Sequence, residues 1–111
     1  MKIETRPWGR FIVLYEDKDT WLKRLIISPG QSLSLQSHEN RDEHWLSNDR
    51  VHYWTEEFEG RLWPGEVLTV PAGTKHRLIN PYEGEVHVLE WATGSPTESD
   101  IIRYEDNYGR T

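Results

Sequence analysis

Short runs of alternating apolar and polar residues, broken by Gly, Pro, Asn and Asp, recur along the whole chain. Because successive side chains of a β-strand point to opposite faces, a period of two is typical of strands with one buried face. No long segment has the 3.6-residue period of an amphipathic helix. The pattern predicts strands over residues 11–15, 21–27, 32–38, 50–54, 58–63, 67–70, 76–79 and 85–91. Many short strands with frequent turns favour an antiparallel sandwich or barrel, an all-β fold.

The third predicted strand shows the alternation clearly. Leu33 and Leu35 are expected on one face of this strand. Ser34, Gln36 and His38 are expected together on the other face. This strand therefore presents an amide and an imidazole on the same side of a sheet.

The length of 111 residues fits one domain spanning the whole chain. Only 35% of the residues are apolar, but six Trp, five Tyr and two Phe supply large side chains for a core. Residues 95–111 form an acidic and polar tail. Its apolar and aromatic residues, Ile101, Ile102, Tyr104 and Tyr108, are expected to pack on the barrel or on a second subunit.

A net charge of −6 argues against binding to nucleic acid or to an anionic membrane, because both require a positive surface. With no Cys in the chain, any metal ion must be held by nitrogen and oxygen ligands. The N-terminus lacks the apolar run of a signal peptide, and no stretch reaches the roughly 20 apolar residues of a membrane span. We therefore expect a soluble, cytoplasmic protein.

Four residues form a plausible mixed ligand set. Gln36 and His38 share a strand face, Glu43 follows within reach of the neighbouring strand, and His76 stands on a distant segment. A single His on a strand is more often a hydrogen-bonded structural residue than a ligand, but here two separated segments supply candidate ligands together. Such ligands suit Zn²⁺, Mn²⁺, Fe²⁺, Co²⁺ or Ni²⁺ better than Ca²⁺, and we expect one divalent ion, with zinc as the first choice. Two coordination positions can stay open for water or substrate oxygens.

The spacing of Gly30, Gln36, His38 and Glu43 resembles the first motif of the cupin family, with Gln in place of its first His. This resemblance implies a double-stranded β-helix, a jelly-roll-like antiparallel barrel. It also implies that two separated motifs supply ligands to one metal ion.

The second cupin motif is matched in full by a spacing that extends over sixteen residues. It comprises Gly65, Pro71, Gly73, His76 and Asn80. His76 is thereby implied as the ligand that joins those of the first motif.

A narrower resemblance, to the type II mannose-6-phosphate isomerases, covers nearly the whole chain. It rests on residues 6–9, 23–25, 29–36, 41–45, 71–78 and 102–110. It implies a metal-dependent aldose–ketose isomerase that interconverts mannose 6-phosphate and fructose 6-phosphate. Gln at the first ligand position is itself typical of that family. In many members this domain follows a mannose-1-phosphate guanylyltransferase, but nothing here resembles that part, so we expect no guanylyltransferase activity.

The chain departs from the family pattern in two places. Glu39 and Asn40 stand where the family commonly has a run of His, and residues 46–50 are polar and lack the usual Gly. Neither change touches the expected ligands. The electrostatic field over the pocket and the shape of one wall are expected to differ, which bears on the substrate.

Isomerisation through a cis-enediol requires a general base within reach of two adjacent carbons. Glu43 is one candidate, although a carboxylate bound to a metal is a weaker base; His44 and Glu90 remain open as alternatives. Alternation turns His44 away from the face of Glu43, and Glu90 is expected to be a solvated residue near a strand end. Arg41 and Arg110 complete the candidate catalytic set.

The substrate phosphate requires cations or backbone donors. Arg41, Lys75, Arg103 and Arg110 are the candidates, because they lie in or beside the matched segments. Lys75 adjoins His76, so on a regular strand it points outward, which favours Arg41 and Arg110. Each of these residues could instead be an ordinary solvated charge.

Two other functions remain open. The barrel could act on a different phosphosugar or another small polar substrate, or it could be a non-catalytic metal-binding or sugar-binding module. The complete ligand set favours an enzyme, since a binding module has little need of all four ligands. The resemblance also implies a homodimer.

Overall fold

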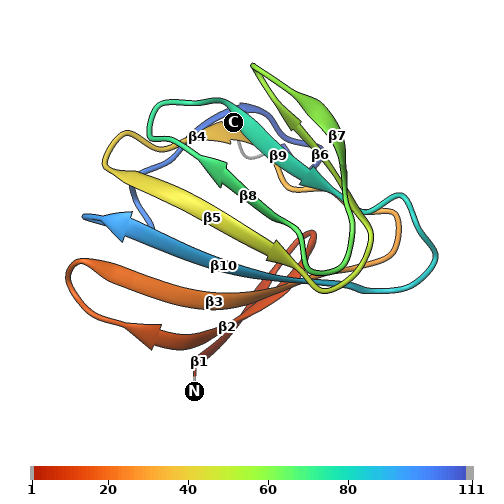
Figure 1. The fold of residues 1–111 in the computed structure, drawn as a ribbon, viewed down its shortest axis with the longest axis horizontal. Helices are drawn as coiled ribbons and strands as arrows, with labels where there is room; N and C mark the ends of the chain where they lie inside the picture. The colour runs from red at the N-terminus through yellow and green to blue at the C-terminus, as the bar shows by residue number, and fades with distance from the viewer. Residues whose placement is uncertain (1, 110–111) are drawn as a thin grey trace.

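A computed structural model describes residues 2–109, which form eleven strands and no helix (Figure 1). The strands are β1 Lys2–Arg6, β2 Gly9–Glu16, β3 Thr20–Ile27, β4 Leu35–Ser37, β5 Arg41–Ser47, β6 Val51–Thr55, β7 Glu59–Leu62, β8 Val67–Val70, β9 His76–Ile79, β10 Val86–Gly94 and β11 Ile102–Glu105. Within the described range, no helix is long and apolar enough to cross a membrane.

The strands form two antiparallel sheets (Figure 1). One has the order β1-β2-β3-β10-β5-β8 and the other the order β11-β4-β9-β6-β7. The chain crosses repeatedly between the sheets, so that β10 lies between β3 and β5, which precede it by many residues. The expected all-β, double-stranded β-helix fold is confirmed.

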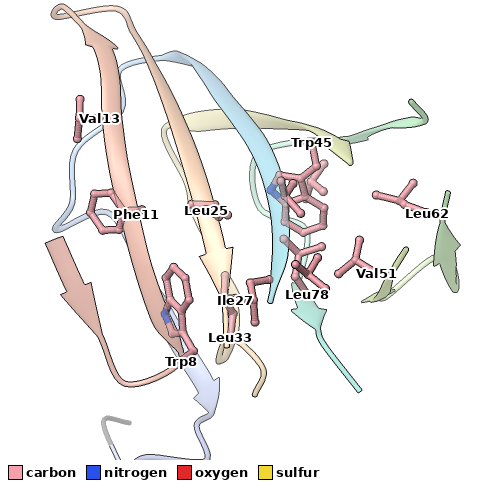
Figure 2. Packing of buried hydrophobic residues seen from close by; sticks show 13 residues of the cluster. Trp8, Phe11, Val13, Leu25, Ile27, Leu33, Trp45, Val51, Leu62 and Leu78 are labelled. Carbon is pink, nitrogen blue, oxygen red and sulfur yellow. The ribbon is translucent and has the colours of Figure 1, made fainter. Parts of the chain in front are cut away.

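The hydrophobic core lies between the sheets and takes residues from both (Figure 2). Ile27 and Trp45 come from the six-stranded sheet, and Val51 and Leu78 come from the five-stranded sheet; all four have no exposed surface. Burial of each such side chain contributes about 1.5–3 kcal/mol to folding. The core occupies one part of the barrel interior, and polar residues occupy the rest.

Charged residues point inward on three neighbouring strands. Lys23 of β3 is paired with Glu90 of β10, and Glu90 is paired in turn with Trp45 of β5. Directly paired residues share one face of a sheet. Lys23 and Glu90 are accordingly buried beside Trp45 rather than solvated. This row of residues places two charges inside the barrel.

Three of the strands, β1, β5 and β11, were not among those predicted from the alternation. In β5 the inward positions include Arg41 and Glu43 as well as Trp45, so a search for apolar alternation does not recognise the strand. The predicted strand over residues 32–38 is reduced to β4 plus an isolated bridge between Ser32 and Ile79.

The prediction that Leu33 and Leu35 share a face is wrong. Leu33 is buried in the core, whereas Leu35 is half-buried and lines an outer hollow with Trp54. The reason is that β4 begins only at Leu35, so the backbone is not a continuous strand between the two residues. Alternation has no meaning across such a break.

The described part of the tail, residues 95–109, lies against the barrel. Its strand β11 pairs with β4, and the Tyr104 hydroxyl forms a hydrogen bond with Ser37 at 2.8 Å. The Tyr108 hydroxyl donates to the side chain of Gln31 at 2.6 Å. The tail thereby forms one wall of the barrel next to the strand that carries Gln36.

Replacement of Asn80 by Ala is expected to lower the free energy of unfolding by about 3 kcal/mol, because it leaves several buried backbone groups unsatisfied. The fully buried amide of Asn80 donates to the carbonyls of Ile27, Ser28 and Gly84 at 2.8–3.2 Å, and accepts from the Tyr82 amide at 2.9 Å. Urea denaturation measures the loss.

Asn48→Ala is the matched control for that experiment. The Asn48 side chain is exposed and accepts one hydrogen bond from Arg24. We expect its removal to change the free energy of unfolding by less than about 0.5 kcal/mol. Equal effects of the two substitutions would contradict a structural role for Asn80.

Candidate metal centre

The four expected ligands come from both sheets. Gln36 lies in β4 and His38 follows it directly, while His76 begins β9 and is paired with Gln36. Glu43 lies in β5 of the other sheet. Both sheets therefore contribute to one cluster.

The two imidazoles and the carboxylate lie within ligand distance of one another. Glu43 Oε1 is 3.0 Å from His76 Nε2, and Glu43 Oε2 is 3.5 Å from His38 Nε2. Their potential ligand atoms all lie within 4.8 Å of one another, and each residue is at most 2% exposed. Gln36 lines the same cavity, and its Oε1 accepts a hydrogen bond from Ser34 at 2.9 Å.

Backbone carbonyls set the orientation of both imidazoles. His38 Nδ1 contacts the Asp100 carbonyl at 2.7 Å, and His76 Nδ1 contacts the Thr74 carbonyl at 2.8 Å. A carbonyl only accepts, so each Nδ1 donates, and each Nε2 is directed toward the cluster. This is the arrangement that metal-binding histidines adopt.

Two buried atoms of the cluster have no hydrogen-bond partner of good geometry among the described residues: Glu43 Oε1 and His76 Nε2. Leaving such atoms unsatisfied is costly. A divalent cation would satisfy both, and two imidazole nitrogens, a carboxylate and an amide oxygen suit a first-row ion. The residues present therefore fit the expected metal.

Burial and the neighbouring charges both shift the pKa values of the cluster residues. Burial lowers the pKa of His38 to about 4, so this imidazole is neutral near pH 7. Burial alone would raise the pKa of Glu43, but the neighbouring His76, His38 and Arg41 hold it well below its ordinary value. Burial alone would lower the pKa of His76, but the Glu43 carboxylate outweighs it and raises that pKa.

Arg41 is buried and directed at the ligands. Its Nε donates to Glu43 Oε2 at 3.0 Å, and one terminal nitrogen lies 3.2 Å from His38 Nε2. The other terminal nitrogen donates to the Thr97 carbonyl at 2.7 Å. Arg41 thus orients the Glu43 carboxylate and ties the tail to the site.

A cavity of about 70 Å³ adjoins the cluster. Its polar lining includes Gln36, His38, Glu43 and Arg41 from the cluster, and also Lys23, Arg6 and Glu90. The apolar part of the lining includes Trp8, Phe11, Leu25 and Leu33, and the tail contributes Glu98 and Ile101. Polar and charged groups therefore make up more than half of the lining, with apolar side chains filling the remainder.

The prediction of a solvated Glu90 is wrong. Glu90 is 6% exposed and accepts hydrogen bonds from the indoles of Trp21 at 3.3 Å and Trp45 at 3.2 Å. Burial, together with the charge of Glu43, raises its pKa to about 7. The sequence does hold a signal: Val88, Glu90 and Ala92 have the same parity on one strand and share its inward face.

His44 is not brought to the cavity. It lies on the outer face of β5, stacked on Trp91 at 5.1 Å, with its Nδ1 3.0 Å from the Thr69 hydroxyl. The alternation had indicated this orientation.

The residues expected to bind the substrate phosphate do not all lie at the cavity. Arg41 lines the cavity, whereas Lys75 lies over the ring of Tyr104 at 4.5 Å and does not line it. Arg103 is paired with Gln36 across β11 and β4, but it does not line the cavity either. Arg110 lies outside the described residues.

Two cations of the cavity wall, Lys23 and Arg6, were missed as site residues. Lys23 shares the inward parity of Trp21 and Leu25, which is the signal that could have found it. A solvated Lys would not be expected between two inward apolar residues of one strand.

The sequence matches a family model described as "Mannose-6-phosphate isomerase C-terminal" over residues 2–106. XanB of Xanthomonas campestris, a xanthan biosynthesis protein, is 38% identical over 108 residues, which cover 96% of this chain and 23% of XanB. ManC of Salmonella typhimurium, a mannose-1-phosphate guanylyltransferase, is 35% identical over 95% of this chain and 22% of its own length. The chain thus spans less than a quarter of these relatives.

Solved structures of similar fold share little sequence with this chain. KdgF of Halomonas sp. has a TM-score of 0.77 at 16% identity, covering 88% of this chain and 90% of its own. A sugar phosphate isomerase from a cupin superfamily, of Silicibacter pomeroyi, has a TM-score of 0.72 at 20% identity, covering 88% and 65%. These likenesses confirm the cupin fold.

Proposed function

Since this chain belongs to the family of mannose-6-phosphate isomerase C-terminal domains, we propose that it is a metal-dependent isomerase of mannose 6-phosphate and fructose 6-phosphate. The observation that carries the proposal is a buried ligand cluster at the wall of a cavity that also holds a second buried carboxyl group, Glu90. A site for aldose–ketose exchange requires both, because one polarises the sugar oxygens and the other moves a proton.

Gln36, His38, Glu43 and His76 would hold the ion. A divalent ion, with zinc as the first choice and manganese, cobalt, nickel or iron also compatible, would supply Lewis-acid polarisation of the sugar oxygens. Arg41 keeps the Glu43 carboxylate oriented through its 3.0 Å hydrogen bond. The indole of Trp45 packs edge-on against His76 at 5.4 Å and keeps water from that side of the cluster.

Glu90 is the general base that this site supports best. Glu43 contacts both imidazoles and Arg41, and its depressed pKa makes it a weak base. The Glu90 carboxylate lines the cavity, and two indole N–H groups fix its position.

The proton balance of this reaction is simple. Toward fructose 6-phosphate, Glu90 accepts the proton from C2 and returns it to C1, while a proton passes from O2 to O1. The pKa of about 7 suits a group that must accept and release one proton in each turnover.

The test is isomerisation of mannose 6-phosphate by metal-stripped protein, before and after addition of Zn²⁺, Mn²⁺, Co²⁺ or Ni²⁺. We expect no turnover without metal and turnover with at least one ion. Thermal shift measured in parallel reports metal binding. Binding of an ion with no turnover by any of them would contradict the isomerase assignment and favour another phosphosugar or a binding role.

A further inference from the structure

Lys23 is a buried cation that the proposed chemistry does not use. It is 4% exposed, and its ammonium lies 3.5 Å from the ring centre of Trp21 and 4.4 Å from that of Phe11. Although Lys23 is paired with Glu90 across β3 and β10, its ammonium forms an ion pair with Glu98 of the tail. A buried ammonium requires an anionic partner, and here a loop residue provides it.

A second cation meets the same carboxylate. One terminal nitrogen of Arg6 lies 3.7 Å from the other oxygen of Glu98 and 3.1 Å from Glu4. The guanidinium also lies over the ring of Phe11 at 4.9 Å. Lys23 and Arg6 therefore converge on one anion at the wall of the cavity.

The anion that these two cations hold, the Glu98 carboxylate, is only weakly bound. The Glu98 side chain is 53% exposed and belongs to the segment that follows β10, so its ion pairs are largely screened by solvent. The two cations stand on strands β3 and β1. The two cations thus belong to strands of the barrel, whereas the carboxylate belongs to a loop.

The cavity is too small for a sugar phosphate in this arrangement. Its volume of about 70 Å³ compares with roughly 300 Å³ or more for ligand pockets. Glu98 and Ile101 are the lining residues that the tail contributes. A shift of the tail segment over residues 95–101 would enlarge the cavity and would remove Glu98 from its two cations.

We propose that Lys23 and Arg6 bind the phosphate group of the sugar phosphate, and that Glu98 is an internal anion which the phosphate displaces. This inference rests on the proposed function for the nature of the ligand. A phosphate monoester carries about −1.5 to −2 charges at pH 7 and three acceptor oxygens, so it exceeds a single carboxylate as a partner for two cations. Lys provides a point charge, and Arg a fork of donors.

This subsite lines the same cavity as Glu90 and the ligand cluster. Lys23, Glu90 and Trp45 form one row across three strands, and Glu43 lies in the next row of β5. On the sheet, Glu90 therefore lies between Lys23 and β5, the strand that carries Glu43.

The test measures binding without turnover. Titration calorimetry of the full chain with inorganic phosphate, fructose 6-phosphate and fructose would be compared between the native protein, Lys23→Met and Glu98→Gln. We expect Lys23→Met to weaken binding of both phosphate ligands about tenfold or more, and Glu98→Gln to strengthen it several-fold. Fructose binding should not respond to either substitution.

The exposed ion pair of Arg10 and Glu85, which lies away from the cavity, offers matched controls. Arg10→Met and Glu85→Gln remove the same charges and should leave all three affinities unchanged. If Lys23→Met does not fold, Lys23→Arg and Glu98→Gln still decide: binding should be retained in the first and strengthened in the second. Affinities for phosphate ligands that do not change in Glu98→Gln would overturn the proposal.

The two proposals can fail separately. Phosphate binding that depends on Lys23, without isomerisation under any metal, supports the anion site and contradicts the isomerase assignment. Isomerisation whose KM is the same in the native protein, Lys23→Met and Glu98→Gln overturns the anion site alone.

Discussion

Replacement of Glu90 by Gln is expected to lower kcat for isomerisation about 10²- to 10⁴-fold, the usual contribution of a positioned general base. Gln keeps the size of the side chain and an oxygen for the indoles of Trp21 and Trp45, which donate to Glu90 at 3.2–3.3 Å. It cannot accept a proton from carbon. Metal binding, followed by thermal shift, and KM should change little. Glu83→Gln, in an exposed turn, is the control and should retain full activity.

The pH profile distinguishes a base from a merely structural residue. Burial and the charge of Glu43 raise the pKa of Glu90 above its ordinary value, so kcat/KM of the native protein should rise with pH as the carboxylate forms and then level off. The residual activity of Glu90→Gln should lack this step. A native profile that does not rise with pH anywhere above the ordinary Glu value, near 4.5, would contradict the assignment.

The free energy of unfolding should fall with rising pH, whereas kcat/KM should rise. The folded protein binds the Glu90 proton more tightly than the unfolded chain, whose Glu titrates near 4.5. Stability from this group is therefore full below about pH 4.5 and falls as pH rises to 7. Glu90→Gln, which has no such proton, should be more stable than the native protein at pH 8. A lower stability of the native protein at pH 8 would mean that Glu90 does not serve to stabilise the fold there, which fits a role in the reaction.

The contrast between Glu90 and His76 shows what the sequence could predict. His76 belongs to a spacing that joins two motifs, and the structure does place it beside His38 and Glu43. Glu90 and Lys23 both lie in predicted strands, but the pattern favours a solvated Glu90 over its alternative role as a base and gives Lys23 no role in the site. A search for apolar alternation assigns every charged residue to the solvent-facing side of a strand. In a barrel with a polar cavity, however, inward positions hold both apolar core residues and charged site residues. The fold class depends mainly on turns and period, so it survives such errors.

Elements at the edges were missed for a related reason. Strand β11 of the tail and strand β1 at the N-terminus are amphipathic only weakly, because each lies at the edge of its sheet. Their pairing is decided by the rest of the barrel, not by their own pattern. The tail could be predicted to pack, but not that Asp100 would orient His38 through its carbonyl.

Replacement of His76 by Ala is expected to abolish metal binding. It should also reduce isomerisation about 10³-fold or more, below detection, since polarisation of the sugar oxygens depends on the ion. His76 Nε2 is buried and lies 3.0 Å from Glu43 Oε1, so the substitution removes a ligand atom from within the cluster. In thermal shift, Zn²⁺ or Co²⁺ should raise the Tm of the native protein but not of the variant. His87→Ala, on the outer face of β10, is the control. A variant that still gains stability from metal would show that the ion binds elsewhere.

Metal affinity should also depend on pH through one proton. Metal binding requires deprotonated ligands. His38, with a pKa of about 4, and Glu43, whose pKa is depressed, have already lost their protons at pH 7. The Glu43 carboxylate raises the pKa of His76, so of the two imidazoles His76 keeps its proton to the higher pH in the metal-free protein. Calorimetry in two buffers of different ionisation enthalpy should therefore report release of at most one proton per ion, falling as pH rises, and affinity should rise up to about tenfold per pH unit while that proton is still held.

The metal-free protein should show the opposite dependence. A His with a raised pKa in the folded state contributes stability that is fully present below its unfolded value, near 6.5, and is lost as pH rises through the folded value. The difference in Tm between metal-bound and metal-free protein should thus widen between pH 6 and pH 9, because the metal-free protein loses stability while metal affinity rises. Release of no proton at any pH, or of two near neutrality, would mean that the pKa values of His76 and His38 are not shifted in these directions. In that case the cluster would need a different protonation state before any step of the isomerisation could be assigned to it.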